Sequence, residues 1–175
     1  MTLSFDRPHV IVDLETTGFS AELHRVTEIA IIDLSMDSPT EWSTLINPCV
    51  PIPSRITELT GIDDDMVKDA PVFADVADDI LGRLDGKVLI AHNASFDHGF
   101  LCAEFARSGL SFAAETLCTV NLSRKLYPHH ASHSLDAIVE RMGIEVTARH
   151  RALDDARALM LFLQAVRRDA SLLGR

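Results

Sequence analysis

The first half of the chain alternates short apolar runs, rich in β-branched residues, with clusters of turn residues. Three such runs cover 10–14, 26–34 and 42–46, and Asn47-Pro48 closes the last of them. No amphipathic helix separates the runs, and a polar stretch at 35–39 lies between the second and the third. This order predicts three strands in an antiparallel meander, with a hairpin joining the last two.

From residue 72 onward the apolar period alternates between that of helices and that of buried strands. Helices are predicted over 72–84, 95–107, 134–142 and about 151–168, and strands over 87–91 and 116–120. Between the two halves, the proline-containing and aspartate-containing segment 51–69 predicts short helical turns near the surface. Alternating helices and strands favour parallel pairing. The predicted fold class is therefore α/β, with a mixed five-stranded sheet of three antiparallel strands and then parallel strands, flanked by helices on both faces.

Composition is consistent with this predicted fold. A length of 175 residues with 47% hydrophobic content suffices for one buried core, so we expect a single domain over 1–175. No stretch approaches the roughly 18 apolar residues of a membrane span, and the three cysteines lack C-x-x-C spacing. We expect a soluble, cytoplasmic protein without a disulfide framework, a zinc site or a membrane partner.

The charge limits how the chain could bind nucleic acid. The formal net charge is −10, whereas a protein that coats nucleic acid normally presents a positive surface to the phosphates. Any contact with nucleic acid must therefore be local. A cluster of carboxylates that holds divalent cations would satisfy this condition, because the bound ions would then face the phosphate.

Two acidic residues stand two positions apart at the end of the first predicted strand. Side chains alternate along a strand, so Asp13 and Glu15 point to the same face. An isolated D-x-E pair is more often a pair of solvated loop charges. Here the apolar run at 10–12 makes Asp13 emerge from the interior of the sheet, where an unpaired carboxylate is costly. This context favours two converging oxygen ligands.

A third candidate follows the buried strand at 87–91. Asp97 falls in the first turn of the next predicted helix, and sites in open α/β sheets commonly form where a strand ends and a helix begins. Taken alone, Asp97 could equally be an acid that compensates the helix dipole. We interpret His92, Asn93 and Phe96 mainly as structural residues, with a substrate contact of His92 or Phe96 as the alternative.

The segment 150–156, HRALDDA, opens the last predicted helix and offers two further carboxylates. At about 100° per residue, Asp155 lies at the edge of the apolar stripe and Asp154 lies about 100° further round. The stripe is formed by Ala152, Ala156, Leu159, Leu163 and Val166. Asp155 is thus predicted to face inward. His150 lies in the loop before the helix, where a neutral imidazole beside a ligand cluster could take a proton from water.

Three segments in this order resemble a known pattern. They are DLETTG at 13–18, HNASFD at 92–97 and HRALDDA at 150–156, and they resemble the three exonuclease motifs of the DnaQ-like (DEDDh) 3′–5′ exonuclease family. The segments LTGI at 59–62 and SL at 134–135 are also similar, so the resemblance covers about 9–164. In that family a histidine lies five residues before the last aspartate, as in this chain. The resemblance implies a ribonuclease H-like fold.

The resemblance also implies a chemistry. Four carboxylates would bind two Mg²⁺ or Mn²⁺ ions: Asp13, Glu15, Asp97 and Asp155. Asp13 would bridge both ions, and His150 would act as general base for water that attacks the last phosphodiester of a DNA 3′ end, single-stranded or frayed. The residues implied to contact the last nucleotides are Thr16, Thr17, Gly18, Phe19, Leu59, Thr60, His92, Asn93 and Phe96.

Several alternatives share parts of this pattern. The same chemistry could act on RNA, as in the oligoribonuclease and RNase T branches, and a low aromatic content of 6% favours DNA only slightly. A catalytically inactive module that binds nucleic-acid ends should have lost a ligand or the base. A nucleotide-sugar transferase would leave His150 and Asp155 unexplained. The motifs fit equally a stand-alone enzyme, a polymerase subunit and a domain of a longer protein.

Overall fold

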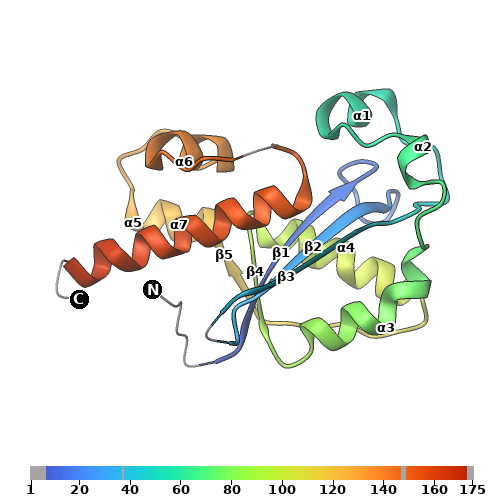
Figure 1. Cartoon of the computed structure of the whole chain (residues 1–175), viewed down its shortest axis with the longest axis horizontal. Helices are drawn as coiled ribbons and strands as arrows, with labels where there is room; N and C mark the ends of the chain where they lie inside the picture. Colours follow the sequence, from blue (N-terminus) through green and yellow to red (C-terminus); the bar gives the residue numbers. More distant parts are fainter. Residues whose placement is uncertain (1–6, 37, 147–148, 173–175) are drawn as a thin grey trace.

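A single mixed sheet forms the centre of the molecule. The computed structural model describes residues 7–36, 38–146 and 149–172. The sheet has the strand order β3-β2-β1-β4-β5 (Figure 1). Its strands are β1 (His9–Thr16), β2 (Val26–Asp33), β3 (Thr40–Leu45), β4 (Val88–Ala91) and β5 (Thr116–Cys118). The first three strands pair antiparallel, whereas β4 runs parallel to β1 and β5 parallel to β4. The predicted fold class is confirmed.

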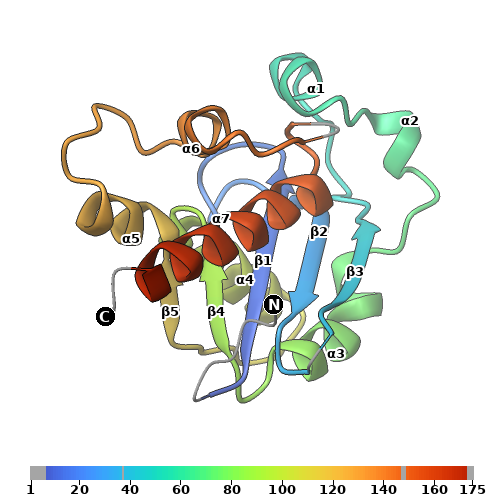
Figure 2. The same cartoon turned by 60° about the vertical axis from the view of Figure 1, so that its left-hand side comes forward.

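Helices cover both faces of this sheet. They are α1 (Ser54–Thr60), α2 (Asp64–Val67), α3 (Phe73–Leu84), α4 (Ala94–Arg107), α5 (Thr119–Leu126), α6 (Leu135–Met142) and α7 (Ala152–Leu172). In Figure 2, α7 crosses one face of the sheet with α6 beside it, and α3 and α4 lie behind the other face. In the described part of the chain, no helix combines the length and the apolar character needed to cross a membrane.

Two hydrophobic cores lie on opposite faces of the sheet, and the side chains of β1 alternate between them. Val10, Val12 and Leu14 join the core under α3 and α4, and Ile11 joins the core under α7. Because side chains alternate in a strand, Asp13 and Glu15 continue the side of Ile11 and extend toward α7. The fold therefore points both carboxylates at the helix that carries Asp155.

A buried glutamate joins α4 to the start of β2. Glu104 is 1% exposed and accepts hydrogen bonds from Arg25 Nε at 2.8 Å, Arg25 Nη2 at 3.0 Å and the backbone N–H of Val26 at 3.2 Å. A buried carboxylate is stable only when its oxygens are satisfied in this way. The contact fixes α4, and with it Asp97, against the strand that neighbours β1.

The last predicted strand is present but shorter than predicted. A strand was predicted near 116–120, whereas β5 ends at Cys118 and Thr119 begins α5, a helix that was not predicted. The buried Thr119 hydroxyl donates to the Ala91 carbonyl at 3.2 Å and pairs with His92 Nδ1 at 3.0 Å. These contacts between segments override the extended preference of a β-branched run. The β2–β3 connection follows the predicted hairpin, whose residue 37 lies outside the described residues.

Candidate active site

Three carboxylates converge where β1 ends. Asp13 and Glu15 lie on β1, and Asp155 lies in the first turn of α7, where it is 6% exposed. One ligand oxygen from each of the three lies within 4.8 Å of the others. Asp155 thus faces inward, whereas Asp154 bonds to Arg157 Nη1 at 3.1 Å on the outer side of the helix. Strand alternation and helix packing together bring residues about 140 positions apart into one cluster.

Asp97 lies beside this cluster but outside the group of three. It occupies the first turn of α4 and is 3% exposed. Its carboxylate accepts the backbone N–H of Leu14, the residue between Asp13 and Glu15, and its negative charge acts on Asp13. The structure therefore gathers all four predicted carboxylates at the end of β1, from both faces of the sheet.

Burial of these carboxylates disfavours their charged forms. Burial, followed by the charges of Asp97 and Glu15, raises the pKa of Asp13 well above its ordinary value. Burial and then the nearby Glu28 raise the pKa of Glu15 to about 7. Burial raises the pKa of Asp97 to about 8, although backbone N–H groups oppose the shift. Clustered acids with raised pKa values are typical of sites that require a cation.

One arginine reaches into the cluster. Arg149 donates hydrogen bonds to Asp155 and, at 2.6 Å, to Asp136. Its positive charge lowers the pKa values of Asp13 and Glu15, against the larger effect of burial. A single guanidinium thus offsets part of the repulsion among the carboxylates. Arg149 was not predicted from the sequence, because the approach of this loop residue to β1 depends on tertiary structure.

A second arginine fixes the start of α7. Arg151 donates to Glu28 through Nε at 3.1 Å and Nη2 at 2.8 Å, and the backbone N–H of Ala152 donates to Glu28 at 3.0 Å. Glu28 lies directly opposite Glu15 in the β1–β2 pairing. Pairing with Arg151 offsets this fifth carboxylate and holds the first turn of α7, which carries Asp155. A glutamate inside the apolar run of β2 was the sequence signal for such a buried ion pair.

His150 lies between these two arginines, in the loop that leads into α7. Its side chain is half-buried, and its backbone has φ of 59°, a left-handed conformation that is uncommon for residues other than glycine. Such strained positions concentrate at functional sites. The structure places His150 five residues before Asp155, immediately ahead of the helix that carries the carboxylate.

The predicted substrate residues of the β1–β2 loop and α1 divide into buried and exposed groups. Thr16 Oγ1 donates to the Gly18 carbonyl at 2.6 Å, and Thr17 Oγ1 accepts the Arg25 N–H at 3.0 Å, so both threonines shape the loop. A Cβ on Gly18 would lie 2.5 Å from the His24 ring, which leaves no room for a side chain. By contrast, Phe19 is 72% exposed.

The α1 pair divides in the same way. Thr60 is buried, and its hydroxyl donates to the Ile56 carbonyl at 3.0 Å, whereas Leu59 is 45% exposed. The β1–β2 loop, which carries Phe19, and α1, which carries Leu59, lie at the same end of the sheet in both views (Figures 1 and 2). These two apolar side chains are available for contact with a ligand.

The predicted residues around the start of α4 are mainly structural, with one exception. His92 pairs with Thr119, and burial followed by the charge of Arg149 lowers its pKa to about 4, so the ring is neutral near pH 7. Phe96 packs on Phe100 with ring centroids 4.8 Å apart. Asn93 is exposed and has a left-handed backbone with φ of 64°. Of the three, Asn93 is free to contact a ligand.

The donor set suits hard divalent cations. The cluster offers carboxylate oxygens, which Mg²⁺ and Mn²⁺ prefer over the sulfur and imidazole ligands typical of zinc sites. Its acids also carry more negative charge than Arg149 alone can balance. The residues that could hold such a cation are Asp13, Glu15 and Asp155, with Asp97 beside them.

Comparison with known proteins gives a consistent result. The model of the RNase T family, described as Exonuclease, matches residues 10–163. The "DNA polymerase III PolC-type" proteins of Caldanaerobacter subterraneus subsp. tengcongensis and Bacillus subtilis are 38% and 35% identical to the chain over 89% and 95% of its length. The chain spans 11% and 12% of these relatives, about a tenth of their length.

Solved structures extend the comparison. Exonuclease X, in complex with 5′ overhanging duplex DNA, is 27% identical with a TM-score of 0.73, over 93% of this chain and 92% of that one. E. coli Exonuclease I, in complex with a dT13 oligonucleotide, has a TM-score of 0.83 over 96% of this chain and 42% of that one. At 19% identity, the second likeness concerns the fold alone.

The raised pKa values predict how stability depends on pH in chelator. Glu15 and Asp97 have folded-state pKa values of about 7 and about 8, whereas unfolded acids titrate near 4. The folded chain therefore binds extra protons between about pH 4 and 8, and its free energy of unfolding falls as pH rises through that window. Urea unfolding in EDTA at pH 5 and pH 8.5 measures this fall.

Asp97→Asn, which mimics the protonated acid, is the matched control. We expect this variant to be more stable than wild type at pH 8.5, by on the order of 3 kcal/mol, and to depend less on pH. Identical pH dependence in the two proteins would show that burial of the charged Asp97 does not limit stability.

Proposed function

The chain belongs to the RNase T exonuclease family, and on that basis we propose that it is a metal-dependent 3′–5′ exonuclease of the DEDDh type. It hydrolyses the last phosphodiester of a DNA strand and releases a nucleoside 5′-monophosphate. The observation that carries the proposal is the convergence of Asp13, Glu15 and Asp155 within 4.8 Å, with Asp97 and His150 beside them. We propose that residues 1–175 form one exonuclease domain.

The carboxylates hold two Mg²⁺ or Mn²⁺ ions in this proposal. Asp13 would be the ligand common to both ions, which is supported by its grouping with Glu15 and Asp155 and by its electrostatic interaction with Asp97. When bound, the cations lower the pKa of the attacking water and stabilise the leaving 3′ oxygen. Arg149 donates to Oδ1 of Asp155, so the other carboxylate oxygen would remain available as a ligand.

His150 acts as the general base. A ring nitrogen of His150 takes a proton from water, the water oxygen bonds to phosphorus, and the bond from phosphorus to the 3′ oxygen of the preceding nucleotide breaks. Its position in the loop before α7 supports this role. His92 is a poorer candidate, because its ring is held by Thr119 and is less basic than an ordinary histidine.

The last nucleotide is held between the β1–β2 loop and α1. These two segments carry the exposed apolar side chains of Phe19 and Leu59; an aromatic side chain such as Phe19 can stack on a base, and Leu59 can wedge beside one. DNA is favoured over RNA by the likeness to "DNA polymerase III PolC-type" proteins and by the DNA complex of Exonuclease X. Those relatives also support a polymerase, fused or separate, as a partner. Cleavage of matched DNA and RNA oligonucleotides tests the choice.

Neighbouring aspartates of α7 provide a matched pair of substitutions. Asp155→Asn should reduce kcat/KM on single-stranded DNA on the order of 10³-fold, because it removes a ligand of cations that supply several kcal/mol of transition-state stabilisation. Asp154→Asn, which loses only the outward contact with Arg157, should stay within about threefold of wild type. Initial rates on an end-labelled oligonucleotide measure both. Equal losses would contradict the assignment of Asp155.

Removal of the proposed base should change the pH profile as well as the rate. His150→Ala is expected to lower the single-turnover rate about 10²- to 10⁴-fold, the usual contribution of a general base, while Mn²⁺ still binds. Histidine changes charge between pH 5 and 8, so the rising limb of the wild-type profile in that range should disappear. If the variant kept the wild-type rate and profile, another group or hydroxide itself would activate the water.

A further inference from the structure

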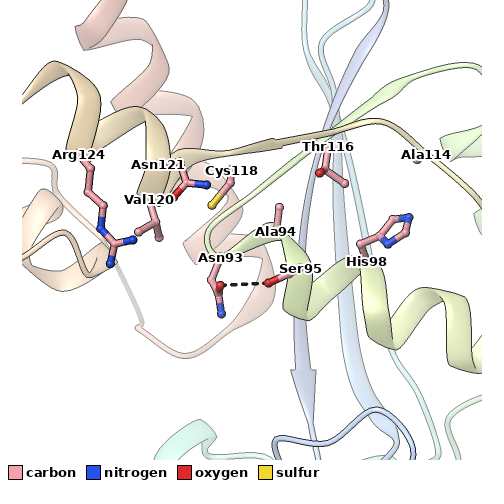
Figure 3. Close-up of a pocket in the computed structure, with 10 residues that line it drawn as sticks. All are labelled: Asn93, Ala94, Ser95, His98, Ala114, Thr116, Cys118, Val120, Asn121 and Arg124. Carbon is pink, nitrogen blue, oxygen red and sulfur yellow. Dashed lines mark hydrogen bonds between the residues drawn. The ribbon is translucent and has the colours of Figure 1, made fainter.

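A polar cavity of about 520 Å³ lies between the start of α4, β5 and α5 (Figure 3). Polar side chains supply much of its lining: Asn93, Ser95, His98, Thr116, Asn121 and Arg124. None of the ten described residues that line it is acidic, in a chain with 26 acidic residues and a net charge of −10. The described residues that line the cavity thus include a cation and no acid, although the whole chain is strongly acidic.

Arg124 is the cation of this cavity. It lies in the last turn of α5, and helical side chains lean toward the helix N-terminus, which brings its guanidinium toward Asn93 (Figure 3). Arg124 forms no ion pair with any acidic residue in the described part of the chain, unlike Arg25, Arg149 and Arg151. A basic residue in the last turn also favours the helix dipole, but that role needs no cavity.

Backbone donors add to this positive character. The left-handed Asn93 makes no side-chain cap on α4. Its backbone carbonyl accepts the N–H of Phe96 at 2.8 Å, so the N–H groups that precede Phe96 are the helix-start donors left without a cap from Asn93. Partial burial alone would raise the pKa of the Cys118 thiol, but the backbone N–H groups of Asn121, Ala94, Val120 and Asn93 outweigh it and lower that pKa. These four residues, from the starts of α4 and α5, all line the cavity together with Cys118.

This combination fits an oxyanion with several acceptor oxygens. Unpaired guanidinium, helix-start N–H groups and amide or hydroxyl side chains are the groups that bind phosphate in proteins. The cavity is also close to the proposed chemistry, because Asn93 precedes Asp97 by four residues, about one helical turn. A strand whose last phosphodiester meets the carboxylates would carry its preceding phosphates past this end of α4.

We propose that the cavity binds a backbone phosphate of the substrate strand, one or two nucleotides upstream of the scissile bond, with Arg124 as its main contact. This inference rests on the proposed exonuclease function. It explains how a chain with a net charge of −10 holds a polyanion. Local contact replaces a broad basic surface.

Two substrates separate this subsite from the chemistry. The p-nitrophenyl ester of thymidine 5′-monophosphate has no upstream phosphate, whereas a single-stranded dT octamer has several. Arg124→Gln should raise KM for the octamer about 10- to 100-fold, with kcat and hydrolysis of the ester unchanged. The slope of log KM against log salt should fall by about 0.7, the value for one phosphate contact on a single strand.

Lys125→Gln is the matched control, because Lys125 is exposed on the same helix, outside the cavity lining, and loses the same charge. We expect it to leave the KM for the octamer near that of wild type. An unchanged KM in Arg124→Gln, an equal rise in Lys125→Gln, or an equal rise on the ester would overturn the subsite. Circular dichroism of both variants verifies that they fold.

Binding without turnover keeps the two proposals distinguishable. Fluorescence anisotropy of a labelled dT octamer in EDTA measures affinity directly, and Arg124→Gln should raise its Kd by the same factor as the KM. If the wild type hydrolysed neither substrate, the exonuclease proposal would fail, and an Arg124-dependent Kd would still support the phosphate site. Equal Kd values for wild type and Arg124→Gln would refute that site whatever the activity.

Discussion

The burial of several carboxylates together at the end of β1 is the constraint that the surrounding structure must balance. Asp13 and Glu15 project toward α7, Asp155 faces them from that helix, and Asp97 approaches from α4 on the other face of the sheet. Burial raises the pKa values of the first, second and fourth of these acids, so each resists ionisation at the place where the fold holds it. Such an arrangement has a physical rationale when cations complete it.

Ion pairs around the cluster hold the elements that carry its carboxylates. Glu28 pairs with Arg151 and so fixes the start of α7, Glu104 pairs with Arg25 and fixes α4, and Arg149 offsets charge inside the cluster. Each buried acid outside the cluster thus has its own guanidinium. Negative charge is therefore concentrated in the carboxylate cluster. The cavity lined by Arg124 is the proposed contact for a phosphate of the substrate strand.

Much of the fold and part of the site could be predicted from the sequence. Apolar periodicity predicted the meander and the parallel strands, and the helix period predicted that Asp155 rather than Asp154 faces inward. The start of α5 at Thr119 was not predictable, because contacts with β4 and His92 set it. The pairing of Arg151 with Glu28 joins residues 123 positions apart, a separation that no local pattern encodes. The phosphate cavity depends likewise on the packing of three elements.

The most direct test of the central claim is a Mn²⁺ titration of the whole chain, with free ion measured by electron paramagnetic resonance at pH 7.5. We expect two bound ions in the wild type and a large loss of affinity in Asp13→Asn, because this substitution removes a charge common to both proposed ions. Asp154→Asn, altered outside the cluster, should bind as the wild type does. Absence of Mn²⁺ binding in the wild type, or equal binding in Asp13→Asn, would contradict the account.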